Sequence, residues 1–257
     1  MYEPAVRRKK SGMPIVGREE IDIIGERLVA EFEPQALVSP REIDIDLFLQ
    51  DYLGMDQDFQ YLSHCGLYLG MTVFRDTDRI PVYDPRGGCA VYISAKARTV
   101  IIDRSLLEEN QEHRYRFTLG HEAGHAVLHG EYFARRRTAG GGAAGSFPAP
   151  LIQCRTDAGK MAPRQPGRWT DHDWMEWQAN ALSSAVLMPA PMVRAVALEA
   201  RKEAPDGMFY KDRVIAQAAT VFNVSFEAAC NRLKQLGHIP RDATFSSYIL
   251  GLIAAQV

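Results

Sequence analysis

The sequence has few cysteines, and none are spaced as a metal-binding or redox pair. The four cysteines, Cys65, Cys89, Cys154 and Cys230, are scattered along the chain without a C-x-x-C pair. A disulfide framework or a cysteine-based zinc knuckle needs closely spaced pairs. The sequence therefore favours reduced thiols in an intracellular protein.

Long apolar runs and a strong charge imbalance are also missing. No apolar segment typical of a secretion signal follows the basic run at 7–10, and the apolar stretch at 248–257 is too short to cross a bilayer. A formal net charge of −2 over 257 residues gives no overall attraction to nucleic acid or to an anionic membrane. We therefore expect a cytoplasmic protein with no membrane partner.

The most informative feature is the H-E-x-x-H pattern from His121 to His125. On a helix, side chains four residues apart share a face, so His121 and His125 can point at one metal ion. Glu122 lies about 100° further round the helix, within reach of a water in an open position of that metal. Two imidazoles, an oxygen ligand and an open position are typical of catalytic zinc. The surrounding helix is largely apolar, and there paired histidines are costly unless something binds them.

A zinc site of this kind needs a third protein ligand. A histidine six residues after His125 would complete a metzincin site, but Glu131 stands there. His129 is about 12 Å along the helix axis from His121, too far to share one metal with both histidines. We expect His129 to cap or support the end of the helix, which Gly130 is placed to terminate.

Glu176 is the best candidate for the third ligand. It lies in the segment 174–180, where tryptophans and small residues indicate a buried helix, and a buried acid needs a partner. Asn180, one turn further on, is placed to hydrogen-bond a ligand. The alternative is that Glu176 is a surface residue near the helix start, favoured by the helix dipole. Asp171, His172 and Asp173 are the rival ligands.

Hydrophobic periodicity and turn residues predict an α+β fold with a small β-sheet packed on the H-E-x-x-H helix. The expected helices are 17–32, 40–53, the H-E-x-x-H helix, and one from the N-cap Thr170 to Met188. The expected strands are 67–79, 90–94 and 99–102, with turns at Pro81, 85–88 and 96–98.

The expected domain organisation has three parts. Residues 1–16 are a flexible basic tail, 17–190 a zinc metallopeptidase domain, and 191–257 a helical C-terminal region. The glycine- and proline-rich stretch 134–170 is a long insertion loop. We hypothesise that it lies over the cleft and gates substrate entry; its Cys154 is either an uninvolved thiol or an inhibitory fourth zinc ligand.

The C-terminal region contains a helix-turn-helix-like segment. A helix ends near Asn223, and Ser225 is placed to cap the next one. The segment carries only a small positive excess, whereas a DNA-reading helix usually needs more phosphate and base donors. A packing role is favoured over direct nucleic-acid binding.

The two motifs together resemble the ImmA/IrrE family of metallo-endopeptidases. The segment 117–129 carries the H-E-x-x-H pattern, and 176–189 carries E-x-x-A-N followed by L-M-P. The resemblance implies a zincin-like domain, Zn²⁺ held by His121, His125 and Glu176, and Glu122 as general base. It also implies a protein substrate, a helix-turn-helix transcriptional repressor whose cleavage switches on mobile-element or stress genes.

Two other functions remain open at this stage. One is a zinc-containing anti-repressor that sequesters a regulator without cutting it, although a pure binding protein has no need of Glu122. The other is a DNA-binding regulator that uses the C-terminal helices. For the enzyme, the donor that would stabilise the tetrahedral oxyanion is left open between Tyr92, His172 and an arginine of the insertion.

Overall fold

The computed structural model describes residues 1–138, 151–155, 169–203 and 209–246. Its helices are α1 (Arg18–Phe32), α2 (Ile45–Leu47), α3 (Glu112–Thr138), α4 (Asp171–Leu187), α5 (Ala190–Glu203), α6 (Tyr210–Phe222) and α7 (Phe226–Gln235), with short 3-10 or π segments η1 (Pro34–Leu37), η2 (Phe48–Tyr52) and η3 (Arg104–Leu107). Its strands are β1 (Asp56–Gln60), β2 (Tyr68–Val73), β3 (Thr77–Asp84), β4 (Cys89–Ala95), β5 (Thr99–Asp103) and β6 (Leu151–Arg155). The α+β class is confirmed.

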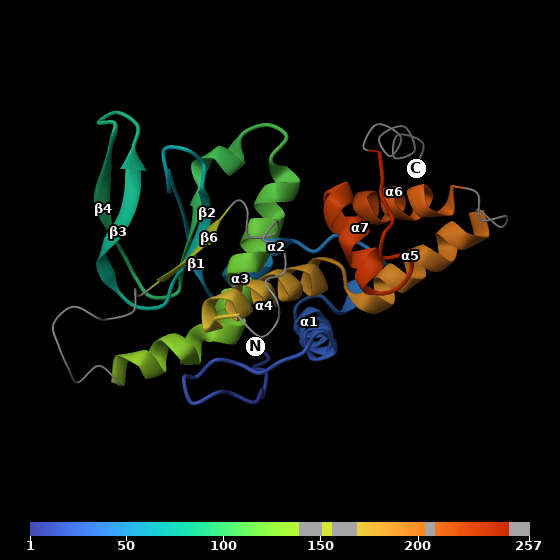
Figure 1. Cartoon of the computed structure of the whole chain (residues 1–257), viewed down its shortest axis with the longest axis horizontal. Coiled ribbons are helices and arrows are strands. Elements are labelled where there is room, and N and C mark those ends of the chain that lie inside the picture. The colour runs from blue at the N-terminus through green and yellow to red at the C-terminus, as the bar shows by residue number, and fades with distance from the viewer. Residues whose placement is uncertain (139–150, 156–168, 204–208, 247–257) are drawn as a thin grey trace.

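Within the described residues, the strands form a four-stranded sheet in the order β1-β5-β2-β6 and a separate β3–β4 hairpin. In the larger sheet, β1 and β5 are parallel, whereas β2 is antiparallel to both of its neighbours. Side chains alternate across this sheet: Val100 and Ile102 join the main core with Leu119 of α3, whereas Ile101 packs with Ile80 of the hairpin. The sheet thus separates α3 from the hairpin (Figure 1).

The strand predictions were partly right. β2, β4 and β5 fall within or close to the expected ranges, but β1 and β6 were missed. Pro81, expected in a turn, lies inside β3 opposite Tyr92. Proline is tolerated there because β3 is a strand of a two-stranded sheet, where a missing N–H costs little.

The H-E-x-x-H helix is longer than predicted. α3 does not end at Gly130 but continues to Thr138. A Cβ at Gly130 would meet nothing within 4 Å, so no close contact demands a glycine there. The extension is held because Tyr132 and Phe133 are buried in a small cluster with Met13.

The helix expected over 40–53 begins later and is irregular. Asp44 caps it by accepting a hydrogen bond from the Leu47 backbone N–H at 3.0 Å. α2 then passes directly into the π segment η2. The predictions for α1 and α4 agree with the structure to within one residue at each end, including the Thr170 N-cap.

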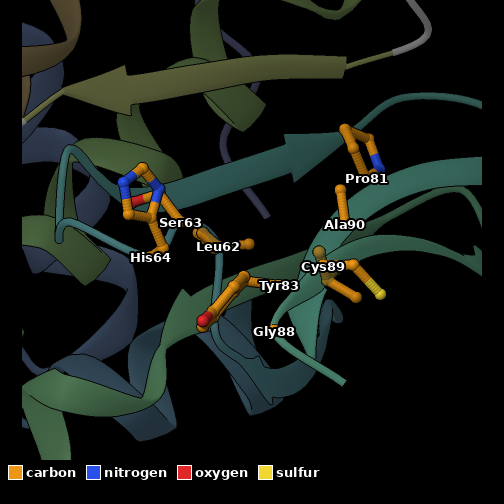
Figure 2. A pocket seen from close by; sticks show the side chains of 9 residues that line it. Leu62, Ser63, His64, Pro81, Tyr83, Gly88, Cys89 and Ala90 are labelled. Atoms are coloured by element: carbon orange, nitrogen blue, oxygen red, sulfur yellow. The ribbon is translucent and has the colours of Figure 1, made fainter. Parts of the chain in front are cut away.

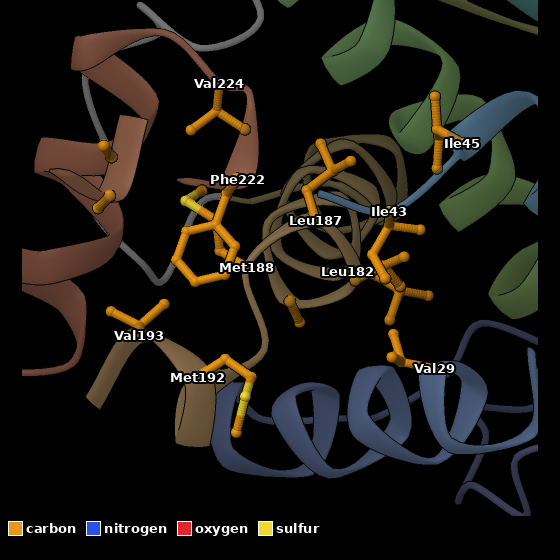
Figure 3. Packing of buried hydrophobic residues seen from close by; sticks show 14 of the residues in the cluster. Val29, Ile43, Ile45, Leu182, Leu187, Met188, Met192, Val193, Phe222 and Val224 are labelled. Atoms are coloured by element: carbon orange, nitrogen blue, oxygen red, sulfur yellow. The ribbon is translucent and has the colours of Figure 1, made fainter. Parts of the chain in front are cut away.

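The main hydrophobic core surrounds α4. Figure 3 shows Leu182 and Leu187 of α4 near Ile43 and near Val29 of α1, with Phe222 of α6 close by. This cluster runs from α1 to α7, so no break in the core marks the expected domain boundary at residue 190. Among the described residues, no single helix is long and apolar enough to cross a membrane; α4 and α5 together, bent by 56°, reach that length and composition, as buried core helices also do.

The predicted helix-turn-helix geometry is present. α6 ends at Asn223, which adopts a left-handed conformation, and the Ser225 side chain accepts from the Ala228 N–H at 3.1 Å to cap α7. The turn is attached to α3, because Arg116 Nε donates to the Asn223 carbonyl at 3.0 Å. The pair of helices is therefore packed onto the start of the H-E-x-x-H helix.

The N-terminal segment differs from the expected flexible tail. Arg8 Nη1 donates to the Leu128 carbonyl of α3 at 2.9 Å, and Met13 is almost completely buried. Burying a methionine side chain contributes roughly 1.5–3 kcal/mol. The segment 8–16 is therefore held against the helices that carry the candidate site, despite its basic composition.

Candidate metal centre

Two glycines of α3 allow α4 to cross it at close range. A Cβ at Gly124 would lie 2.9 Å from the Ala179 carbonyl oxygen, and one at Gly120 would lie 2.6 Å from Ser183 Oγ. At Gly124 the close atoms belong to the backbone of α4, so a larger residue there would keep the helix axes further apart, whereas at Gly120 it would first displace the Ser183 hydroxyl. The close crossing brings Glu176 of α4 beside the histidines of α3.

The structure brings His121, His125 and Glu176 together. The two histidine Nε2 atoms are 2.9 Å apart, and Glu176 oxygens lie 3.5 Å from His121 Nε2 and 3.3 Å from His125 Nε2. Tetrahedral zinc with bonds of about 2.0–2.1 Å separates its ligand atoms by roughly 3.3 Å. Among the described residues, these three form the group able to hold a metal ion. The distances between the ligand atoms and the chemistry of the three side chains fit zinc.

The three rival ligands lie outside this group. Asp171 pairs with Lys9 at 2.8 Å, and Asp173 takes part in the capping box at the start of α4. His172 is 3.9 Å from a Glu176 oxygen, but its side chain is 63% exposed and it stands outside the group. The geometry therefore favours Glu176 over all three.

The ionisation states of the group suit metal binding. Burial, reinforced by the nearby His121, lowers the pKa of His125 to about 4. Burial by itself would raise the pKa of Glu176, but hydrogen bonds and charge interactions with His121 and His125 outweigh it, and the pKa falls well below its usual value. At neutral pH the imidazole of His125 is neutral and the carboxylate ionised, the forms in which each binds a metal.

The Nδ1 atoms of both histidines, which point away from the group, also have hydrogen-bond partners. His121 Nδ1 lies 2.9 Å from Asn180 Oδ1, as predicted for Asn180. His125 Nδ1 lies 2.9 Å from His129 Nδ1. His129 is buried in the middle of α3 rather than capping its end, so its predicted role was wrong: it supports His125 instead.

Glu122 has the surroundings of a proton acceptor. Thr72 Oγ1, on β2, donates to Glu122 Oε2 at 2.6 Å, while Glu122 Oε1 has no hydrogen-bond partner among the described residues. Burial raises the pKa of Glu122 to about 7, against the lowering effects of His121 and Thr72. Thr72 was not identified from the sequence, because nothing local links a strand residue to the helix it will contact.

Gly70 of β2 leaves the room that Glu122 occupies. A Cβ at this position would lie 2.5 Å from Glu122 Oε1 and 2.9 Å from Thr118 Cγ2. We expect Gly70→Ala to displace the Glu122 carboxylate. A displacement of about 1 Å should lower turnover roughly 100-fold. Zinc content should stay at the wild-type level, since the ligands are untouched. Parallel measurement of bound zinc and of kcat checks this; unchanged kcat in a folded Gly70→Ala protein would contradict it.

Gly124→Ala tests the helix crossing. Its Cβ would collide with the Ala179 backbone of α4. We expect the free energy of unfolding to fall by roughly 1–3 kcal/mol, together with a loss of zinc affinity as α4 shifts. Gly130→Ala, on the same helix but in open space, is the matched control and should be neutral or slightly stabilising. Urea unfolding with and without zinc gives both quantities. If the two variants had the same unfolding free energy and the same zinc affinity, Gly124 would not be needed for the close helix crossing.

A surface concavity lies apart from this group. Figure 2 shows it between the β3–β4 hairpin and the segment that carries Ser63 and His64. It measures about 410 Å³ and includes no residue of the candidate metal centre. Tyr92 belongs to the same hairpin, on the opposite face of the sheet from Glu122, so the structure argues against it as the oxyanion donor.

The structure describes part of the expected insertion loop. Residues 151–155 form β6, which pairs with β2 and places Cys154 at the register position opposite Gly70. Residues 139–150 and 156–168 lie outside the described residues, as does the Cys154 side chain. Of the insertion arginines considered as oxyanion donors, Arg135 is described and pairs with Glu131 at 3.0 Å, whereas the side chains of the others lie outside the described residues. The gating role and the inhibitory cysteine stay predictions.

Comparison with known proteins supports the resemblance seen in the sequence. A peptidase family model, the IrrE N-terminal-like domain (Peptidase_M78), matches residues 156–234. The match includes Glu176, whereas His121 and His125 lie before it. No curated protein matches the chain. Over residues 156–234 the chain is therefore similar to the IrrE N-terminal-like peptidase domain, and this segment contributes Glu176 to the histidine–histidine–glutamate group.

Proposed function

We propose that this protein is a zinc-dependent endopeptidase with a zincin-like catalytic domain. One observation carries the proposal: a buried carboxylate with a free oxygen, Glu122, lies directly after His121 in the group formed with His125 and Glu176. A site built only to hold a metal needs the three ligands. The fourth residue, held in place by Thr72, is the one that hydrolysis requires.

The residues divide the chemistry between them. Zinc, when bound by His121, His125 and Glu176, supplies a Lewis acid that polarises a peptide carbonyl and acidifies water. Glu122 Oε1 accepts the proton of the attacking water and later delivers it to the leaving amine. Thr72 keeps Glu122 Oε2 occupied, so that Oε1 is the oxygen that exchanges the proton.

For the substrate, we propose a helix-turn-helix transcriptional repressor in the bacterial cytoplasm, cleaved to release mobile-element or stress genes. This part rests on the family resemblance. A role as a DNA reader is less well supported, because Arg232 of α7 is buried and paired with Asp22 at 2.7 Å, and so is withdrawn from phosphate contacts. Glu122 in turn argues against an anti-repressor that binds without cutting.

The test is direct cleavage of a purified helix-turn-helix repressor encoded beside the gene. The zinc-loaded protein should cut it at a defined site, identified by mass spectrometry of both fragments. Removal of zinc with 1,10-phenanthroline should stop cleavage, and added zinc should restore it. Tight complex formation without cleavage would favour the anti-repressor, and cleavage that survives chelation would point to a contaminating protease.

A further inference from the structure

A continuous hydrogen-bond chain runs from the candidate ligand His125 to the backbone of the N-terminal segment. His125 Nδ1 lies 2.9 Å from His129 Nδ1, and His129 Nε2 lies 3.0 Å from Gln178 Oε1. Gln178 Nε2 then donates to the Pro14 carbonyl at 3.1 Å. We propose that His129 and Gln178 are positioning residues for His125, and that the segment 8–16 is a structural part of the metal centre through them.

The chain has one consistent direction. Metal binding uses His125 Nε2, so the proton of its neutral ring is on Nδ1 and is donated to His129. Neutral His129 then carries its own proton on Nε2 and donates it to the Gln178 carbonyl oxygen. The Gln178 amide nitrogen is left to donate, and the Pro14 carbonyl can only accept. Every donor meets an acceptor, and the arrangement holds His125 in the tautomer whose Nε2 is free for a metal.

The far end of the chain is anchored as well. All three side chains, His125, His129 and Gln178, are buried, so a broken link would leave an unsatisfied polar group in the interior. Pro14 follows the buried Met13, and Lys9 pairs with Asp171 at the start of α4. The segment is thereby fixed to both helices that carry the candidate ligands.

This arrangement couples the segment to the metal in both directions. Outer partners of a metal-binding histidine typically alter metal affinity 10–100-fold. By linkage, a segment that strengthens metal binding is itself held more firmly when the metal is bound. The inference rests on the proposed zinc centre, and its experiment separates the two.

The experiment measures zinc affinity, by competition with a chromophoric chelator, for the wild-type protein, three test variants and one control variant. Gln178→Met and His129→Leu remove links and should weaken zinc binding by about 10–100-fold. His129→Asn places an amide oxygen near the former Nδ1 and so keeps an acceptor for His125; it should recover most of the affinity. Gln217→Met, at a buried glutamine bonded to Glu203 in the helical region, is the matched control and should bind as wild type.

Hydrogen exchange reports on the segment itself. The Lys9 and Ile15 amides donate to Met13 and Arg7 carbonyls, and so follow the order of the segment. Zinc should slow their exchange in wild type and in Gln217→Met, but not in Gln178→Met or His129→Asn. His129→Asn carries this test if Gln178→Met fails to fold.

The outcomes discriminate between the two proposals. Zinc binding by wild type with unchanged affinity and exchange in folded Gln178→Met and His129→Leu overturns the inference alone. Failure of wild type to bind zinc overturns the metal centre, and the inference with it. If the variants bound zinc more weakly but the zinc-dependent hydrogen exchange of the segment 8–16 were unchanged, His129 and Gln178 would position His125 alone. The segment would then not be part of the metal centre.

Discussion

Glu122→Gln should abolish peptide cleavage while leaving the metal in place. The amide is close in size to the carboxylate but cannot accept a proton, so the loss of general-base catalysis is expected to lower kcat by roughly 10²–10⁴-fold. In the wild-type protein Thr72 Oγ1 donates to Glu122 Oε2 at 2.6 Å. The glutamine side chain can accept the same hydrogen bond and so occupies the same space. Neither histidine nor Glu176 is altered, and bound zinc should remain near the wild-type level.

The measurement pairs kcat with metal content on the same protein preparation. Glu227→Gln, the same chemical change at an exposed position of α7, serves as the control and should leave both quantities unchanged. If Glu122→Gln were folded, zinc-loaded and as active as wild type, Glu122 would not be the base, and hydrolysis would need another proton acceptor. If it bound substrate without cutting it, the variant would also provide a stable complex for identifying the cleavage site.

The parts of the site that the sequence predicted are those set by local geometry. His121 and His125 share a helix face because of their spacing, and Asn180 lies one turn from Glu176 for the same reason. Their closeness in the structure follows from these intervals once α3 and α4 cross. The crossing itself depends on Gly124, whose contact with the Ala179 backbone becomes apparent only when the neighbouring helix is present.

The parts that the sequence did not predict depend on contacts between distant segments. Thr72 and Gly70 meet Glu122 across 50 residues of chain or more, through a sheet whose register no local pattern specifies. β6 was hidden in a stretch rich in glycine and proline, and it exists because β2 offers an edge to pair with. The basic run near the N-terminus suggested a mobile tail, but one buried methionine, Met13, outweighs that composition.

Glu176→Ala should remove zinc, because it takes away the one carboxylate in the ligand group. Outer partners alone change metal affinity by 10–100-fold, so loss of a direct ligand should exceed about 100-fold. The two histidines remain, with Nε2 atoms 2.9 Å apart, but two imidazoles cannot complete the coordination of a zinc ion that requires at least three protein ligands. Cleavage should fall to background as the metal is lost.

The control for this variant concerns His172, a rival ligand whose Nε2 lies 3.9 Å from a Glu176 oxygen. If Glu176→Ala is folded and still binds zinc, the double variant Glu176→Ala/His172→Ala decides whether His172 has moved in as a substitute. Loss of zinc only in the double variant would make Glu176 a preferred but replaceable ligand. Zinc retained in both would exclude the α4 carboxylate and its neighbour alike, and the third ligand would then have to come from another segment. Because the His172 side chain is largely exposed whereas Glu176 lies in the group with His121 and His125, we expect the single substitution to be sufficient.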